Sequence, residues 1–71
     1  MSFTKKEIEF GVLKQKDSNR IAIYENRTCF RYIYAGGLIK DFRIVGSSVI
    51  IILKDGITKR FTGPTSYEYV Y

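Results

Sequence analysis

The chain has 71 residues, enough for a single domain (residues 1–71) with one small core. A composition of 45% hydrophobic, 15% aromatic and 27% charged residues excludes a disordered polymer, and no apolar run approaches the roughly 20 residues that cross a bilayer. The formal net charge of +5 favours acidic partners, although the 12 basic residues are scattered along the chain rather than gathered in one run.

Two patterns overlap near the N-terminus. Thr4 and Glu7 have the spacing of a helix capping box, and Gly11 stands where a C-cap glycine belongs. From Ile8 onward, however, apolar residues occupy every second position, which is the pattern of a strand. We favour a strand over roughly residues 7–15 that is entered through a short helical turn at Thr4.

The rest of the chain consists of strand-forming segments separated by turn residues. The predicted strands cover residues 20–25, 28–34, 38–45, 49–53, 57–61 and 67–71. With the N-terminal segment this makes six or seven short strands, at the spacing typical of small all-β folds. We predict an antiparallel meander that forms a curled sheet or a small barrel. In so short a chain a two-sheet sandwich is less favoured, and closure of a barrel also removes the edge strands that invite aggregation.

The clearest local signal is a β-hairpin within residues 47–62. A two-residue turn at Asp55 and Gly56 fits, and so does a three-residue turn that starts at Lys54 and places Gly56 in the left-handed region. We favour the three-residue turn because it makes one face of the hairpin almost entirely apolar. The register that follows has three pairs on that face: Leu53 with Ile57, Ile51 with Lys59, and Val49 with Phe61.

Alternation then divides the side chains between a core face and an opposite face. The predicted core consists of Phe30, Tyr32, Phe42, Ile44, Val49, Ile51, Leu53, Ile57 and Phe61. The opposite face has an aliphatic centre with arginines around it. Its predicted members are Arg31, Ile33, Asp41, Arg43, Ile50, Ile52, Thr58 and Arg60.

An aliphatic patch bordered by arginines is typical of a protein-binding surface. Ile50 and Ile52 carry this expectation, because they lie opposite the core face on a strand that is apolar on both sides. Our leading hypothesis is a non-enzymatic protein-interaction module: an adaptor, a small inhibitor or a self-associating unit. The expected partner is another protein or a second copy of the chain, and not a membrane.

Nucleic-acid binding is the alternative hypothesis. Residues 30–34 interleave aromatic side chains with Arg31, as single-strand binding surfaces do. The terminal strand adds a stripe of tyrosines, Tyr67, Tyr69 and Tyr71, of the kind that is enriched in recognition surfaces.

Little in the sequence points to catalysis. The chain has no histidine, so it lacks the usual acid–base group near neutral pH. The single cysteine, Cys29, has no internal disulfide partner and no histidine to activate it, and we interpret it as a small buried side chain. We therefore expect no enzyme, metal or cofactor. The free thiol and the absence of an apolar leader favour a cytoplasmic location.

Overall fold

The computed structural model describes residues 2–70, in which one short helix precedes seven strands. The elements are α1 (Lys5–Phe10), β1 (Val12–Asp17), β2 (Arg20–Tyr24), β3 (Phe30–Tyr34), β4 (Ile39–Val45), β5 (Ser48–Leu53), β6 (Thr58–Phe61) and β7 (Tyr67–Val70). All paired strands among these residues run antiparallel to their neighbours. The prediction of an antiparallel all-β meander is therefore confirmed.

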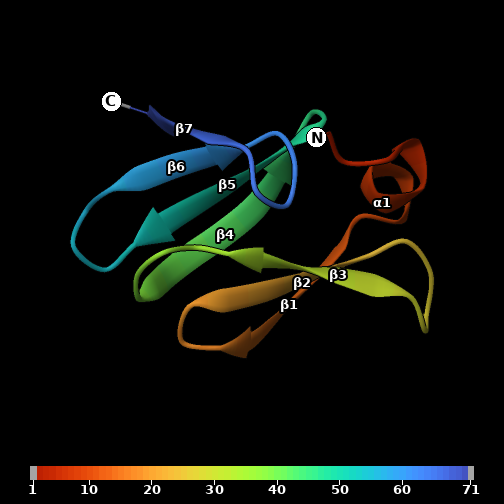
Figure 1. The fold of residues 1–71 in the computed structure, drawn as a ribbon, viewed down its shortest axis with the longest axis horizontal. Helices are drawn as coiled ribbons and strands as arrows, with labels where there is room; N and C mark the ends of the chain where they lie inside the picture. The colour runs from red at the N-terminus through yellow and green to blue at the C-terminus, as the bar shows by residue number, and fades with distance from the viewer. Residues whose placement is uncertain (1, 71) are drawn as a thin grey trace.

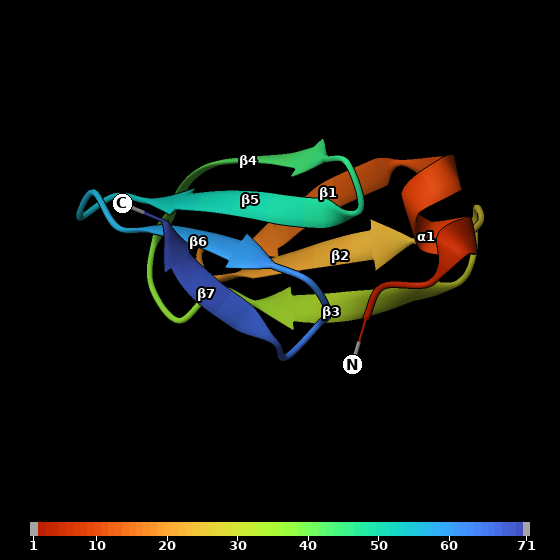
Figure 2. The ribbon, with the colours of Figure 1, turned by 90° about the horizontal axis from the view of Figure 1, so that it is seen from above.

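The strands form two sheets, one with the order β1-β2-β3 and the other with the order β4-β5-β6-β7. Figure 1 shows them as two layers with α1 at one end, and Figure 2 shows the same arrangement from above. The barrel that we favoured does not form, because no ladder joins β3 to β4. The connection between them is instead tied back to the β1–β2 turn: Ala35 N donates to Asn19 O (2.9 Å) and Ile39 N donates to Ser18 O (2.9 Å).

The N-terminal segment is a helix where we favoured a strand. Thr4 Oγ1 accepts from Glu7 N (3.2 Å) while Glu7 Oε1 accepts from Thr4 N (2.8 Å), which completes the capping box. Gly11 ends the helix in the left-handed conformation, with φ of 66°. The strand begins only at Val12, and the helical turn expected at Thr4 extends to Phe10.

The β5–β6 hairpin has the predicted three-residue turn. Gly56 has φ of 93°, and Leu53 N donates to Ile57 O (2.8 Å) across the turn. The register pairs Val49 with Phe61 and Ile51 with Lys59, as predicted. Ile57 is nevertheless 42% exposed, so its assignment to the core is corrected. It directly follows the turn, at the end of the hairpin.

The core fills the space between the sheets. Its buried residues are Phe3, Ile21, Ile23, Ile33, Ala35, Ile39, Val49, Ile51, Leu53 and Phe61. Phe42 and Ile44 pack against them and are half-buried. A β-bulge between Ile39 and Asp41 shifts the register at the start of β4. The bulge allows Ile39 to join Phe42 on the inner face.

Phe30 and Tyr32, which we assigned to the core, lie on the outer face of the three-stranded sheet. Strand β3 carries apolar side chains on both faces, and the structure buries Ile33 against Ile21 of β2. Because side chains alternate along a strand, the residues that flank Ile33 must point outward. Phe30 is accordingly 39% exposed and Tyr34 is 59% exposed.

Candidate functional site

The outer face of the three-stranded sheet carries four aromatic rings and three basic side chains, which we call the aromatic face. Its members are Tyr24, Phe30, Tyr32 and Tyr34 together with Lys14, Lys16 and Arg20. The rings form a continuous line, with centroid separations of 5.0 Å, 5.3 Å and 6.3 Å between successive rings. The register explains the line, because Tyr24 of β2 lies directly opposite Phe30 of β3.

The basic side chains extend over these rings. Lys14 Nζ lies 5.4 Å from the centroid of Tyr24, and Lys16 Nζ lies 5.2 Å from the centroid of Phe30. The guanidinium carbon of Arg20 lies 4.7 Å from the centroid of Tyr32. These distances are within the range of cation–π attraction, which holds cations beside Tyr24, Phe30 and Tyr32.

Asp17 is the carboxylate that borders the aromatic face. It accepts from Arg20 Nε at 2.6 Å, and this hydrogen bond holds the pKa of Asp17 below its ordinary value. The same contact raises the pKa of Arg20. Both groups are therefore charged at neutral pH. Three cations and one carboxylate leave the face with a formal charge of +2.

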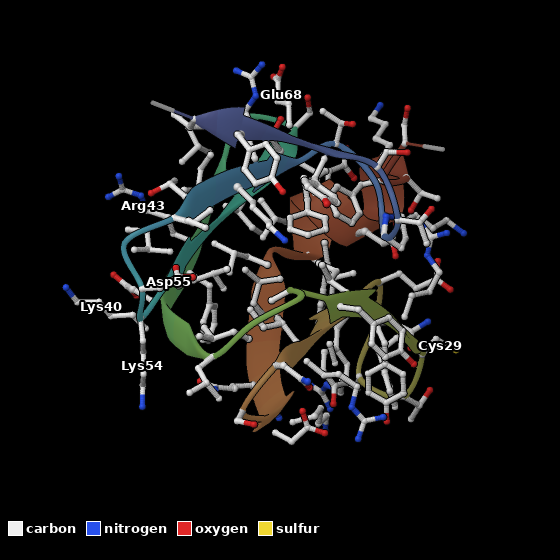
Figure 3. All side chains as sticks on the ribbon, turned by 60° about the vertical axis from the view of Figure 1, so that its left-hand side comes forward. Cys29, Lys40, Arg43, Lys54, Asp55 and Glu68 are labelled. Carbon is white, nitrogen blue, oxygen red and sulfur yellow. The ribbon has the colours of Figure 1, made fainter. Side chains whose placement is uncertain are left out.

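The predicted aliphatic patch is partly assembled on the outer face of the four-stranded sheet. Arg43, Ile50 and Arg60 are register neighbours across β4, β5 and β6, and Ile52 lies on the same face. Both isoleucines are half-buried. Arg60 forms an ion pair with Glu68 of β7. Figure 3 shows Arg43 and Glu68 on this side of the molecule, far from Cys29.

Two residues predicted in the patch belong to the other sheet. Ile33 has no exposed surface and lies in the core. Arg31 points toward α1, where its Nε and Nη2 donate to Glu7 at 2.8 Å and 2.6 Å. Alternation placed them correctly opposite Phe30 and Tyr32, but that face of β3 is the inner one. Neither residue can be part of a surface on the four-stranded sheet.

The ion pair between Glu7 and Arg31 shifts the pKa values of both partners so that the charged forms are favoured. Arg31 holds the pKa of Glu7 below its ordinary value through the hydrogen bonds, although burial acts in the opposite direction. The pKa of Arg31 is raised, chiefly by Glu7 and to a smaller extent by the nearby charge of Glu25. Both partners are therefore ionised at neutral pH.

The tyrosine stripe of β7 faces inward at the open edge of the sandwich. Tyr67 and Tyr69 are 45% and 50% exposed, and their ring centroids lie 4.4 Å and 5.8 Å from Lys59 Nζ. Tyr71 lies outside the described residues. Lys59 itself is 7% exposed and donates to Ala35 O at 2.9 Å, which links the sheets. The hairpin register already placed Lys59 on the inner face, but it did not indicate this contact.

The described residues also bear on three other features: a buried thiol, a metal site and a membrane span. Cys29 is exposed, which corrects our interpretation of a buried side chain. Within residues 2–70, no three His, Cys, Asp or Glu side chains are grouped so that they could hold a metal ion. The same residues contain no helix with the length and apolar character of a membrane span.

These features describe a small antiparallel β-protein of two sheets, with an aromatic and basic surface on one sheet and an aliphatic patch on the other. No protein-family model matches the chain, and no curated protein or solved structure is significantly similar to it.

Proposed function

We propose that the protein binds single-stranded nucleic acid on the aromatic face. The observation that supports this proposal is the continuous line of four rings with three cations beside it. Single-strand binding surfaces combine the same two elements, because aromatic rings stack on bases of any sequence while basic groups attract the backbone. The net charge of +5 adds a long-range attraction for a polyanion.

The arrangement of the rings suits unpaired bases. Phe30, Tyr32 and Tyr34 follow one another along β3, an edge strand, so a nucleic acid strand can run beside them. Adjacent rings are inclined by 78° and 51°, and so they are not stacked face to face on one another. Bases in a duplex already stack on their neighbours, and we therefore expect a preference for single strands.

The proposal keeps the alternative drawn from the sequence but changes the cations that serve it. Arg31, the cation that we interleaved with the rings, is bound to Glu7 on the inner side of β3. Lys14 and Lys16 of β1 and Arg20 of β2 take its place. The role is one of binding, without catalysis.

Fluorescence anisotropy with labelled oligonucleotides of about ten nucleotides tests the proposal. Affinity should fall with salt, with a slope of about −0.7 per phosphate contact for a single strand. Replacing Lys14 and Lys16 together with Gln should flatten the slope by about 1.4 units. The double replacement of Lys40 and Lys54 with Gln removes the same charge from the four-stranded sheet and should leave the slope nearly unchanged (Figure 3).

Ring variants locate the binding surface. Tyr34→Ala should weaken binding roughly 5- to 150-fold, because stacking of one base on an aromatic side chain contributes about 1–3 kcal/mol. Tyr69→Ala removes an exposed tyrosine from the other sheet and should change affinity little. The reverse result would move the site to the tyrosine stripe of β7. Absence of binding to any oligonucleotide at low salt would refute the proposal.

A second candidate function, protein interaction or self-association, rests on the aliphatic patch. Ile50 and Ile52 remain half-buried on the outer face, while α1 packs against β2 of the other sheet and leaves the patch uncovered. Ile52→Glu, followed by light scattering and circular dichroism, should convert any oligomer into a folded monomer or abolish capture of a partner. Unfolding of a protein that was monomeric from the start would assign Ile52 to the intramolecular core and remove this candidate.

A further inference from the structure

A cavity of about 410 Å³ opens between the N-terminus of α1 and the turn that joins β2 to β3. Glu7 lines it from the helix, and Glu25, Thr28, Cys29 and Arg31 line it from the hairpin. Phe30 also lines the cavity, and it belongs at the same time to the aromatic face. The cavity therefore adjoins the line of rings at Phe30, the first ring of β3. Its volume is within the range of small-ligand sites.

The turn that forms one wall of the cavity is internally braced. Asn26 Oδ1 accepts from Thr28 N at 2.9 Å and from Cys29 N at 2.8 Å. Glu25 N donates to Cys29 O at 3.0 Å and closes the turn. These hydrogen bonds hold the wall in one conformation without a ligand, so little ordering is required when a ligand binds.

The charged groups of the cavity have unused hydrogen-bonding capacity. Arg31 engages Glu7 through Nε and Nη2, and a guanidinium has five N–H donors in all, so others remain for a ligand. The Glu25 side chain is half-buried, and within residues 2–70 no donor hydrogen-bonds to its carboxylate. The cavity thus offers a carboxylate acceptor and guanidinium donors at the same time.

We infer that this cavity binds one guanine base of the bound strand, an inference that rests on the proposed function. Guanine presents two adjacent donors, N1–H and the N2 amino group, which a carboxylate such as that of Glu25 can accept together. It also presents the O6 and N7 acceptors, which an arginine recognises. Adenine and cytosine have a single amino donor on the corresponding edge, and thymine and uracil have a single ring N–H. In an unpaired strand this edge of the base is accessible.

The position of Phe30 predicts where the guanine stands. Three of the rings run along β3 from Phe30 to Tyr34, with Tyr24 of β2 opposite Phe30, and the cavity lies at the Phe30 end of β3. A strand that follows the rings enters the cavity only with its terminal bound nucleotide. The preference for guanine should therefore be confined to one end of the bound segment.

A set of eight-nucleotide oligothymidines tests this inference by fluorescence anisotropy, with a single guanine in the first, a central or the last position. We expect about tenfold tighter binding for one of the two terminal positions and no gain for the central position. Glu25→Gln should remove this gain, measured as the ratio of the affinities for the guanine-containing and the unsubstituted oligothymidine. Glu9→Gln, an equal change of charge at an exposed site on α1, should retain the gain.

Thermal melting of both variants verifies that they are folded. Equal affinity for every oligonucleotide of the set would overturn the guanine site while leaving the proposed function in place. A gain that survives in Glu25→Gln would also overturn it. Absence of binding to all members of the set would overturn both the site and the proposed function.

Discussion

The ion pair between α1 and β3 should be a main source of stability, and Glu7→Gln tests it. The Glu7 side chain is 2% exposed and accepts three hydrogen bonds, one from Thr4 N and two from Arg31. Removing one partner of a buried pair costs about 3–5 kcal/mol. Because the Arg31 side chain is 38% exposed, water recovers part of that cost, and we expect a loss of about 2–3 kcal/mol.

Such a loss is large for a chain of this size. At about 0.05–0.15 kcal/mol per residue, the whole domain has a free energy of unfolding of roughly 4–11 kcal/mol. The melting temperature of the variant should fall by about 10–20 °C. Urea unfolding followed by circular dichroism at pH 7 measures the same difference. The control is Glu9→Gln, whose ion pair with Lys5 is exposed and should contribute about 0.5 kcal/mol or less.

The pH dependence gives this prediction a second test. The folded-state pKa of Glu7 lies below its ordinary value of 4.5, so the ion pair stabilises the fold fully above that pH. The contribution is lost as the pH falls through the lowered pKa. The difference between wild type and Glu7→Gln should therefore be complete at pH 7 and shrink below about pH 4.5. A difference under about 0.5 kcal/mol at pH 7, or one that does not change in acid, would refute the reasoning.

Four further substitutions test the hairpin and the link between the sheets by urea unfolding. Gly56→Val places a β-branched side chain at φ of 93° and should cost about 1–2 kcal/mol or more, so an unchanged midpoint would contradict the turn. Ile51→Ala leaves a cavity at a fully buried position and should lower the free energy of unfolding by about 2–5 kcal/mol. Ile50→Ala, on the outer face of the same strand, should lower it by about 1 kcal/mol. Equal losses for the two variants would mean that the inner and outer faces are misassigned. Lys59→Ala removes the donor to Ala35 O and should cost about 1–3 kcal/mol, and full stability would show that this contact does not hold the sheets together.

The β5–β6 hairpin could be predicted in detail because its determinants are local. A left-handed glycine in a three-residue turn sets the register, and a register set by a turn places every side chain of both strands. Ile51 and Lys59 therefore face inward as predicted, and Ile50 and Arg60 face outward. The same local rule explains why the residues of the aliphatic patch on the four-stranded sheet lie next to one another.

In the N-terminal segment, the capping residues of a helix overlap with an alternating pattern that is typical of a strand. Thr4, Glu7 and Gly11 carry the information for both ends of the helix, and alternation over the same residues indicated a strand. The structure adds a reason for the outcome. Glu7 is bound by Arg31, 24 positions away, and in the helix it also completes the capping box with Thr4.

The surface proposed for nucleic acid depended on tertiary structure. Alternation correctly separated Phe30 and Tyr32 from Arg31 and Ile33, but both sets contain apolar residues, so the sequence of β3 does not specify which set is buried. Ile21 of β2 and the facing four-stranded sheet make that choice, because an aliphatic face packs into the narrow space between the sheets.

The separation into two sheets and the cavity beside α1 have the same origin. Both arise from contacts between segments distant in sequence, such as Ile39 N with Ser18 O and Glu7 with Arg31. The periodicity of a strand determines which side chains share a face, and turn residues determine where it ends. Neither the periodicity nor the turn residues specify which other strand or sheet the strand packs against. The sequence alone thus determined the strands, the hairpin register and the composition of each face, whereas the packing of the layers decided which faces are buried and which remain free to bind.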